Sequence, residues 1–408
     1  MRNPNIIAGL DIGSSMVRVV ITEIEDDRLK IVGIGKASSG GIRRGVVVNL
    51  EKTITAINQA VKDAEAMAGV KVSSVFVSIG GDHIRSLNSR GIVAVSRSSG
   101  EITHSDIARA IDAARAVAIP MDREIIHTIP QEFTVDDQTG IKDPTGMSGV
   151  RLEVDVHIVT AAGTSAQNLF RAVRKAELEV EELVLTPLAS AAAALSEDEQ
   201  ELGSLLIDFG GGTTDLAVFY DGSIRHSAVI GLGGKSVTND IAIGLRIPLD
   251  AAESLKIKYG CALSTLIDAE ETLALPNSGG RAAREISRSV LTAIIEPRVE
   301  EILRLALREL RRTPFAKNLS TGIVLTGGAA TMPGVLELCE KIFNIPAKIG
   351  VPQDFSGLTD VVKDPGFTTA LGLLLYGLRD DDFDAVFEEE NILIRWLEPI
   401  LRLFRKKS

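Results

Sequence analysis

Cysteine, aromatic residues and long apolar runs are all scarce in this chain of 408 residues. Its two cysteines, Cys261 and Cys339, have no second Cys and no His at metal-ligand spacing, which disfavours a disulfide framework and a zinc site. We therefore expect a reducing compartment. No apolar run reaches the length of about 18 residues that a membrane-spanning helix needs, and Met1–Asn5 has no signal-peptide pattern. These absences predict a protein that starts in the cytosol and contacts membranes only peripherally.

An excess of positive charge is also lacking. Lys and Arg total 44 against 55 Asp and Glu, and no basic stripe or RNA-binding aromatic motif occurs, which argues against nucleic acid as a partner. The charge is unevenly distributed. Residues 391–408 carry a net charge of +4, so the other 390 residues carry −15, and the two sum to the total of −11. Just before that tail lie Asp380–Asp384 and Glu388–Glu390. Like charges so close repel one another, so we expect residues 380–390 to form an acidic linker that is extended or disordered.

The chain does contain a large apolar fraction, arranged with two different periods. With 45% hydrophobic residues it can bury the cores of two or three domains. Short β-branched runs predict strands, and longer segments with apolar residues three or four positions apart predict helices. The predicted strands are Ile6–Ile12, Val17–Thr22, Val75–Ile79, Ser204–Asp208, Leu216–Tyr220 and Gly322–Thr326, and the predicted helices are Leu50–Ala68, Ser105–Val117 and Ala283–Leu310. This alternation indicates an α/β fold.

One pattern occurs twice: a strand, an aspartate, glycine with small hydroxyl residues, and another strand. The copies span Leu10–Val19 and Ile207–Leu216, with Asp11 and Asp208 separated by 197 positions. Copies about half a chain apart suggest two similar halves that face a cleft. Glycine allows close backbone approach, and hydroxyls with exposed N–H groups form an anion-binding concavity. The predicted phosphate contacts are Gly13, Ser14, Ser15, Gly210, Gly211, Gly212, Thr213 and Thr214.

A carboxylate is tolerable beside a phosphate only with a cation between them. We therefore expect Asp11 and Asp208 to hold Mg²⁺, mainly through water. Both turns can also be interpreted as ordinary β-hairpin turns, since Asp and Gly are common there. The three glycines and two threonines of the second copy exceed what a turn requires, and the paired occurrence favours phosphate binding.

A third glycine-containing turn follows the predicted strand Gly322–Thr326. Gly327, Gly328 and Ala329 precede a predicted helix over Val335–Ile342, and bare backbone there lets a nucleotide pack closely. Taken alone this turn is a weak signal, because strand-to-helix turns often use glycine for steric reasons.

The two hairpins and the glycine turn, in this order and spacing, resemble the actin-like ATPase superfamily. In that superfamily, two phosphate hairpins and an adenosine-binding turn line a cleft between two lobes. Thr186–Leu195 and Asp364–Gly372 are similar to its two connecting helices, whose small residues let the helices cross closely. The resemblance implies a two-lobed ATP-binding α/β fold with ATP and Mg²⁺ as ligands. It also implies that Glu253 and Lys256 belong to the adenosine-contacting helix.

Three further segments, Ile129–Phe133, Gly140–Val154 and His157–Thr160, resemble the signature of the FtsA family of bacterial division proteins. The resemblance runs from about Gly9 to the C-terminus and implies an inserted FtsA-type subdomain over residues 83–163, on another side of the molecule from the usual actin subdomain. The family pattern divides the rest into a first lobe core (1–82 and 164–198, completed by about 364–379), a second lobe core (199–229 and 304–363), a second-lobe outer subdomain (230–303), the linker 380–390 and a terminal amphipathic helix (391–408).

That terminal helix separates its apolar residues from its charged ones when it is viewed along the axis. The residues predicted to bind anionic lipid are Ile392, Leu393, Trp396, Leu397, Ile400, Leu401, Leu403, Phe404, Arg402, Arg405 and Lys406. Trp and Leu would enter the acyl boundary, and the cations would meet the head groups. Docking on the protein's own core or on a partner groove is the alternative. Pro399 requires the helix either to start there or to kink, and the sequence does not choose.

The FtsA resemblance implies an ATP-binding protein that forms actin-like filaments and anchors the tubulin-like division protein FtsZ. The expected location is the cytoplasmic side of the inner membrane, where the division septum forms with further division proteins. In the region that matches the family's FtsZ site, a predicted helix over Arg284–Arg298 presents Arg284, Arg288 and Arg298 to the acidic C-terminal peptide of FtsZ. A solvated helix face is the alternative.

Two rival functions belong to the same superfamily. One is an ATP-hydrolysing enzyme or kinase, and the other is a pilus-assembly adaptor, which should lack the amphipathic tail. Hydrolytic relatives begin the first connecting helix with Glu or Gln, where this chain has Thr186, so we expect no enzyme activity beyond slow ATP hydrolysis. Met16 stands where many relatives place a lysine against the phosphates, and Arg18 is the candidate substitute.

Overall fold

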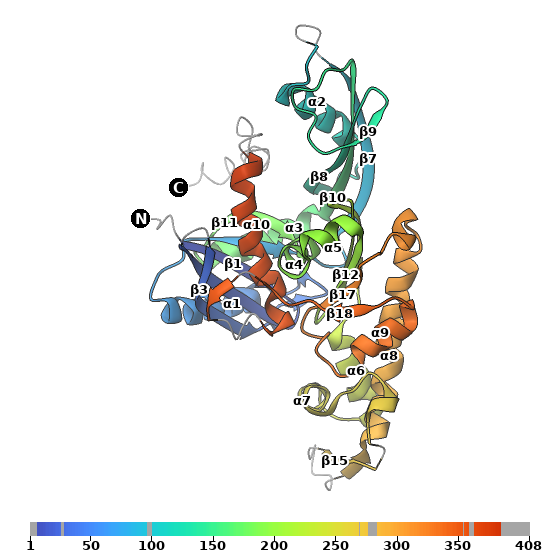
Figure 1. Ribbon diagram of the computed structural model, residues 1–408. Helices are drawn as coiled ribbons and strands as arrows, with labels where there is room; N and C mark the ends of the chain where they lie inside the picture. Colours follow the sequence, from blue (N-terminus) through green and yellow to red (C-terminus); the bar gives the residue numbers. More distant parts are fainter. Residues whose placement is uncertain are drawn as a thin grey trace.

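The computed structural model describes residues 6–25, 28–95, 100–268, 270–275, 284–353, 355–358 and 363–384. Two sheets form the middle of the molecule, with a projecting unit at one end and an outer helical unit at the other (Figure 1). The predicted membrane-binding residues between positions 391 and 408, and linker residues 385–390, lie outside the described residues. The α/β prediction is confirmed.

The first lobe is built on a six-stranded sheet with the order β11-β6-β1-β2-β3-β19. β1 pairs antiparallel with β2 and parallel with β6. The strands are β1 (Ile6–Ile12), β2 (Met16–Glu25), β3 (Arg28–Ser38), β6 (Ser74–Ile79), β11 (Glu179–Leu185) and β19 (Phe355–Gly357). Helices α1 (Leu50–Ala68) and α3 (Gly163–Lys175) pack against this lobe, and the small ladder of β4 (Ile42–Arg43) and β5 (Val46–Val47) lies before α1.

Helix α1 illustrates how local sequence sets the packing of the first lobe. Asn49 caps its first turn by accepting a hydrogen bond from the Lys52 N–H, and Gly69 ends it with a φ of 70°. The helix crosses β3 at Gly35, where an added Cβ would lie 1.7 Å from the Ala60 carbonyl oxygen. The absence of a side chain therefore lets the helix lie directly on the strand backbone.

The second lobe repeats the arrangement of the first. Its five-stranded sheet has the order β14-β13-β12-β17-β18, and β12 pairs antiparallel with β13 and parallel with β17. The strands are β12 (Ser204–Phe209), β13 (Thr214–Tyr220), β14 (Ser223–Ile230), β17 (Gly322–Thr326) and β18 (Ala347–Ile349). Helices α5 (Glu197–Leu202), α8 (Arg288–Leu310) and α9 (Val335–Phe343), with the 3-10 turn η2 (Pro314–Lys317), complete this lobe. The prediction of two halves of similar design is confirmed.

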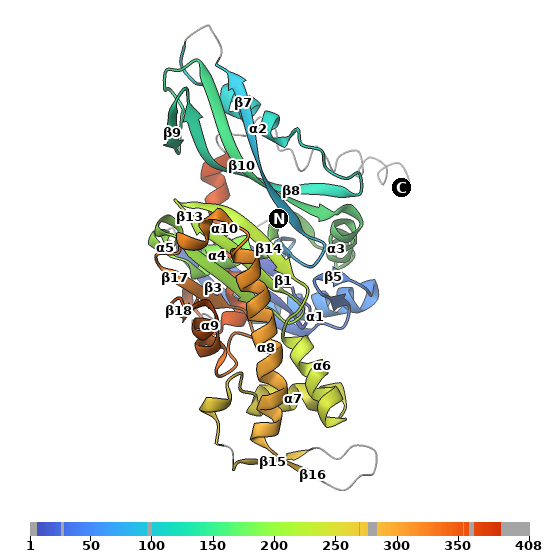
Figure 2. The ribbon, with the colours of Figure 1, turned by 90° about the vertical axis from the view of Figure 1, so that its right-hand side faces the viewer.

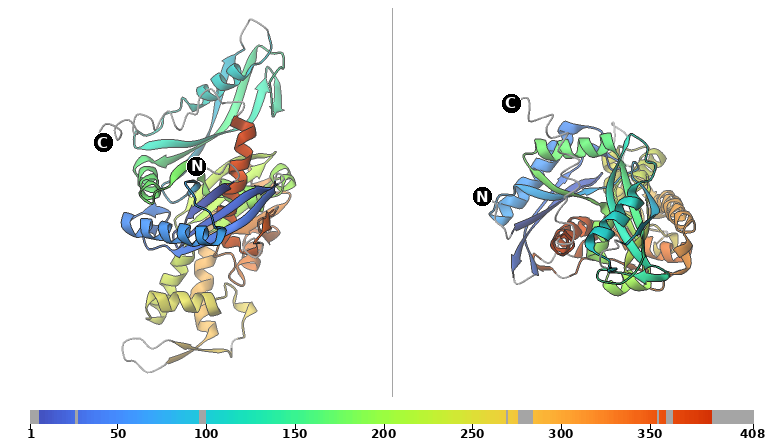
Figure 3. Two further views of the ribbon diagram at one scale, coloured as in Figure 1. Left: turned by 90° about the vertical axis from the view of Figure 1, so that its left-hand side faces the viewer. Right: turned by 90° about the horizontal axis from the view of Figure 1, so that it is seen from above.

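Two helices connect the lobes. These are α4 (Thr186–Ala194) and α10 (Thr368–Asp384), the latter preceded by the turn η4 (Pro365–Phe367). They cross closely, because an added Cβ on Gly372 would lie 1.7 Å from the Ala189 carbonyl oxygen. The view from above looks along α10 and places it beside the first-lobe strands (Figure 3). The predicted close crossing of small residues is confirmed.

The inserted unit is a separate four-stranded sheet with the order β7-β10-β8-β9. Its elements are β7 (Arg85–Ala94), α2 (His104–Arg115), β8 (Arg123–Val135), β9 (Gln138–Ile141) and β10 (Arg151–Ala162). Thr103 and Asp106 form a capping box at the start of α2, which covers one face of the sheet over its own small core. Figure 2 shows this sheet projecting away from the two central sheets.

The outer unit of the second lobe lies at the opposite end. It consists of α6 (Gly234–Leu245), α7 (Leu249–Tyr259), the turn η1 (Ser264–Leu266) and the short ladder of β15 (Thr272–Leu275) with β16 (Arg284–Ser287). The long helix α8 runs from this unit up to the second-lobe sheet (Figure 2).

Two predicted segments differ from the structure. The helix expected from Ala283 begins only at Arg288, because Arg284–Ser287 pairs with β15 and the Ser287 hydroxyl caps the helix start. Asp380–Asp384, expected to be extended, continues α10. Extending a helix that is already fixed by packing costs little free energy compared with starting a new one. No helix in the described ranges is both long and apolar enough to cross a bilayer.

Candidate functional site

The tips of the two predicted hairpins meet between the lobes. An added Cβ on Gly211 would lie 2.1 Å from the Ser15 hydroxyl oxygen, and one on Gly212 would lie 2.4 Å from that of Ser14. These glycines are therefore required for the contact between the lobes, in addition to any role in binding a ligand.

A cavity of about 320 Å³ opens beside the hairpin tips. It gathers residues from both lobes and from the outer unit that are far apart in the sequence. The predicted residues that line it are Asp11, Gly13, Ser14, Ser15, Asp208, Gly210, Gly211, Gly212, Thr213, Glu253, Lys256, Gly327, Gly328 and Ala329. Thr214 does not line it: this residue is fully buried, and its hydroxyl donates a hydrogen bond to the Leu232 carbonyl oxygen at 3.0 Å. The prediction that the Thr214 side chain contacts phosphate is therefore wrong.

The two predicted aspartates are buried beside this cavity. The Ser78 hydroxyl donates to Asp11 at 2.8 Å, and the Arg18 guanidinium lies 3.8 Å from the same carboxylate. Burial raises the pKa of Asp11 to about 6, against the opposing effect of Arg18. Asp208 accepts hydrogen bonds from the hydroxyls of Ser190 at 2.6 Å and Thr369 at 3.2 Å, and burial raises its pKa as well.

A third buried carboxylate, Asp215, was missed by the sequence reasoning. It lines the cavity and faces Asp208 across the β12–β13 ladder. The Thr213 hydroxyl donates to its Oδ2 at 2.8 Å, whereas its Oδ1 has no partner among the described residues. Burial, followed by the charge of Asp208, raises the pKa of Asp215 to about 8. The signal was present in the sequence, because residues placed symmetrically about a hairpin turn lie opposite each other.

These carboxylates fit a divalent cation that they contact mainly through water molecules, with a bound ligand supplying the other coordinating atoms. The free oxygen of Asp215 is a polar atom that lacks a partner, and three acids share one buried region. Within the described ranges, no three or more His, Cys, Asp or Glu side chains converge closely enough to ligate a metal ion directly. A cation here would therefore need further ligands, such as phosphate oxygens.

Positive groups also line the cavity. Arg18 lies beside Asp11, and its guanidinium stands 5.3 Å from the centre of the Phe367 ring. On the wall formed by the outer unit, the Lys256 ammonium donates to Glu253 at 2.7 Å and to the Thr238 hydroxyl at 2.8 Å. Arg18 therefore faces the cavity, as expected for a substitute of the lysine that Met16 replaces.

The third glycine turn contributes two glycines with different constraints. Gly327 has a φ of 86°, and an added Cβ would lie 2.3 Å from the Asp208 carboxylate, so packing alone requires glycine there. Gly328 has no atom nearer to an added Cβ than the Arg18 guanidinium at 3.7 Å. Packing within the protein does not explain the glycine at 328, which leaves bare backbone facing the cavity.

The start of α4 also reaches the cavity. Thr186 lines it, and an added Cβ on Gly80 would lie 2.6 Å from the Thr186 hydroxyl oxygen and 3.6 Å from Asp215 Oδ1. The side chain at the beginning of this helix is therefore a hydroxyl next to a carboxylate.

The three arginines predicted to bind the FtsZ peptide lie away from the cavity. Arg284 is in β16 and not in a helix, which corrects the predicted helix over Arg284–Arg298. Arg288 begins α8 and pairs with Glu271 at 2.7 Å, and Arg298 pairs with Asp240 at 2.5 Å and with Glu301. Both are already engaged in ion pairs and remain partly exposed.

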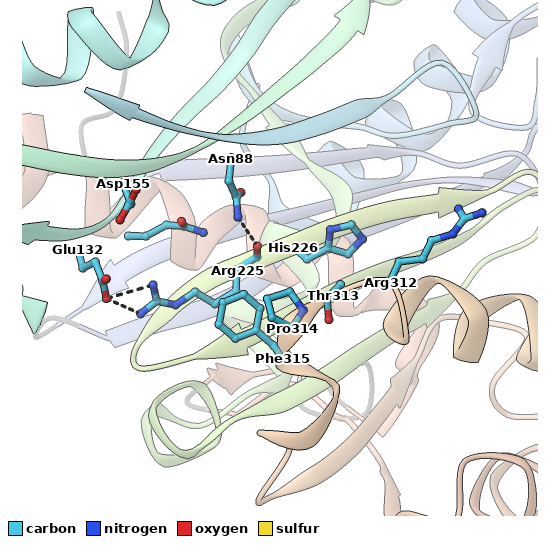
Figure 4. A pocket seen from close by; sticks show the side chains of 10 residues that line it. Asn88, Glu132, Asp155, Arg225, His226, Arg312, Thr313, Pro314 and Phe315 are labelled. Atoms are coloured by element: carbon cyan, nitrogen blue, oxygen red, sulfur yellow. Dashed lines mark hydrogen bonds and ion pairs between the residues drawn. The ribbon is translucent and has the colours of Figure 1, made fainter. Parts of the chain in front are cut away.

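A second cavity of about 330 Å³ lies where the insert meets the second lobe (Figure 4). The Asn88 amide donates to the Arg225 carbonyl oxygen at 3.0 Å, and the Arg225 guanidinium pairs with Glu132 at 3.4 Å. Nearby, His157 is hydrogen-bonded to Asn88 at 2.6 Å and to the Ser227 hydroxyl at 2.9 Å. Polar contacts thus dock the insert on β14.

The sequence matches profiles of two families. The family described as cell division protein FtsA matches residues 205–372, and the SHS2 domain inserted in FTSA matches residues 81–160. The cell division protein FtsA of Pseudomonas aeruginosa is 49% identical over 380 residues, which cover 93% of this chain and 91% of that protein. FtsA of Neisseria meningitidis serogroup B is 47% identical over 406 residues, with coverage of 96% and 98%. FtsA of Escherichia coli K12 is 38% identical over 380 residues, with coverage of 91% and 90%.

Solved structures resemble the fold over most of the chain. The PilM–PilN type IV pilus biogenesis complex has a TM-score of 0.66 at 18% identity and covers 91% of this chain and 98% of its own. MreB5 of Spiroplasma citri bound to ADP has a TM-score of 0.56 at 16% identity, with coverage of 96% and 100%. At these identities the likeness concerns the fold alone. The duplicated hairpins, the inserted sheet and the extent of the sequence match together place this chain in the FtsA family of actin-like cell-division proteins.

Proposed function

We propose that this chain binds ATP with Mg²⁺ between its lobes, assembles into actin-like filaments and links FtsZ to the cytoplasmic side of the inner membrane. Family membership supports the role in division. The observation that carries the nucleotide part is the meeting of two equivalent glycine hairpins and three buried carboxylates at one cavity. The fold neighbour MreB 5, described as bound to ADP or AMPPNP, adds support.

The residues divide into three groups by chemistry. Gly13 and Gly210 line the cavity, but their N–H groups donate to the Met16 and Asp208 carbonyl oxygens. The backbone N–H groups that would hold phosphate are those of Ser14, Ser15 and Gly211–Thr213, and Asp11, Asp208 and Asp215 would hold Mg²⁺ mainly through water. Adenosine would lie against Lys256, Glu253 and the 327–329 turn. Bound Mg²⁺ would supply positive charge that neutralises the phosphates.

We infer that the nucleotide acts mainly as a conformational ligand. Thr186 cannot orient an attacking water as a carboxylate or carboxamide would, so turnover should be slow. FtsZ would bind the outer unit through Arg284, Arg288 and Arg298, and residues 391–408 would hold the protein on anionic lipid, because that segment carries a net +4 beside an apolar face.

Titration calorimetry with Mg-ATP tests the nucleotide site. Gly328→Leu should fold normally, because the position has space for a side chain, but it should fill the cavity and weaken ATP binding by about tenfold or more, which corresponds to about 1.4 kcal/mol. The matched control is Gly40→Leu at an exposed glycine away from the cavity, where an added Cβ meets only the Lys52 side chain at 3.6 Å. Equal ATP affinity for wild type and Gly328→Leu would place the nucleotide elsewhere.

A further inference from the structure

Lys235 occupies an unfavourable position for a cation. It lies in the first turn of α6, where unpaired N–H groups give the helix end a partial positive charge, and no acidic residue accompanies it in that turn. In the part of the chain that the structure describes, its ammonium forms no ion pair. Loss of hydration lowers the pKa of this ammonium group. Local helix preferences therefore do not explain a lysine here.

The two nitrogen atoms of Lys235 reach both hairpins. Its backbone N–H donates to the Gly211 carbonyl oxygen at 2.7 Å, and its Nζ donates to the Ser14 carbonyl oxygen at 2.5 Å. Gly211 is in the turn of the second-lobe hairpin, whereas Ser14 is in the turn of the first-lobe hairpin. A single residue thus ties the two lobes at the point where the turns touch.

This tie joins two turns that line the cavity, but Lys235 itself does not line it. Gly234, the residue before it, lines the cavity, but Lys235 is absent from the described residues that do so. Its ammonium is bonded to the backbone of the first-lobe turn, which places it to control the separation of the hairpins.

We propose that Lys235 is a positioning residue that holds the two hairpins together over a bound nucleotide and slows its release. The inference rests on the proposed ATP binding. The lobes must part for the ligand to leave, and parting breaks the contact between Lys235 and Ser14. Entry into an already open cleft does not require that contact, so its loss changes the rate of dissociation more than the rate of association.

Stopped-flow measurements with a ribose-labelled fluorescent ATP and Mg²⁺ on the full chain test this role. Lys235→Met keeps the length of the side chain but removes the charge, and we expect nucleotide release about tenfold faster with association changed by less than about twofold. Lys235→Arg should restore most of the slow release. The control Lys258→Met, at an exposed lysine of α7 that lies over Tyr259, should release nucleotide like wild type.

Equal release rates for wild type and Lys235→Met would overturn the proposal, as would an equal acceleration in Lys258→Met. A change confined to the association rate would also overturn it, since Lys235 would then serve ligand capture. Hydrogen exchange without nucleotide separates this inference from the proposed function. Faster exchange around residues 13–15 and 210–212 in Lys235→Met supports the tie even if no ATP binds, and unchanged exchange there contradicts it.

Discussion

Buried carboxylates dominate the cleft at the scale of single residues. Asp11, Asp208 and Asp215 have lost most of their hydration, and burial raises the pKa of each. Such a group is stable as an anion only beside a positive partner, and Arg18 reaches Asp11 but not the free oxygen of Asp215. The chemistry of the site therefore favours a ligand that brings its own cation.

The first prediction concerns that free oxygen. Asp215→Asn keeps the shape of the side chain but removes the charge, so Mg-ATP should bind about tenfold to one-hundredfold more weakly, in line with the loss of one charge-assisted hydrogen bond. Binding of ATP in excess EDTA should change much less. Calorimetry in both buffers measures the difference, with Asp112→Asn on the exposed face of α2 as control. An equal loss of affinity with and without Mg²⁺ would mean that Asp215 does not act on the cation.

The second prediction concerns His157, which is 1% exposed at the junction of the insert with β14. Burial lowers its pKa from 6.5 to about 3. As the pH falls from about 6.5, the unfolded chain therefore binds a proton that the folded chain does not, and the free energy of unfolding decreases by up to about 1.4 kcal/mol per pH unit from this group.

Urea unfolding of wild type and His157→Gln between pH 8 and pH 4.5 measures this effect. The variant should be less stable throughout, because it loses hydrogen bonds. Its stability should run parallel to that of wild type above about pH 7.5 and fall less steeply below about pH 6.5. Parallel curves over the whole range would show that His157 binds protons equally in the folded and unfolded chains.

At the scale of elements, the sequence was sufficient to predict the bounds of a helix or strand where one local pattern of residues determines them. β1, β17 and α1 occupy their predicted bounds, because runs of buried β-branched residues or one apolar helical face determine them. The start of α8 was wrong because Arg284–Ser287 pairs with a strand that the apolar spacing of the helix does not reveal. Asp215 could have been predicted from its place opposite Asp208 in one hairpin. The tie made by Lys235 could not, because it depends on how two hairpins face each other, which single-sequence patterns do not encode.

The third prediction concerns α8 and the arginines through which we propose that it binds FtsZ. Arg298 is partly neutralised by Asp240, so its removal should weaken binding of the acidic FtsZ peptide by a few-fold and reduce the salt dependence of binding. Fluorescence anisotropy at low and moderate salt measures both quantities for Arg298→Gln. Arg304→Gln is a matched control on the same helix, since Arg304 pairs with Glu300. If both variants bind the peptide like wild type at low salt, the peptide contacts another surface.

At the scale of the whole molecule, the insert lies apart from the cleft, because none of its described residues lines the cavity. The insert contacts both lobes, because His127 accepts a hydrogen bond from the Leu185 N–H of the first lobe and Ser86 donates to the Ser227 carbonyl oxygen of the second. The cleft, the insert and the proposed FtsZ site lie on different parts of one chain, which suits the proposed role of linking partners. Many weak tail contacts along a filament would raise membrane occupancy through effective concentration.

Flotation of anionic lipid vesicles with a labelled FtsZ C-terminal peptide tests the central claim most directly, because it requires membrane binding and FtsZ binding by the same chain. With ATP and Mg²⁺ present, the peptide should float with the vesicles when the full chain is added. It should stay in solution with a chain truncated after Glu390, and Trp396→Glu should reduce flotation nearly as much, because it puts a charge into the apolar arc. Equal flotation of the peptide with the full and truncated chains would contradict the account.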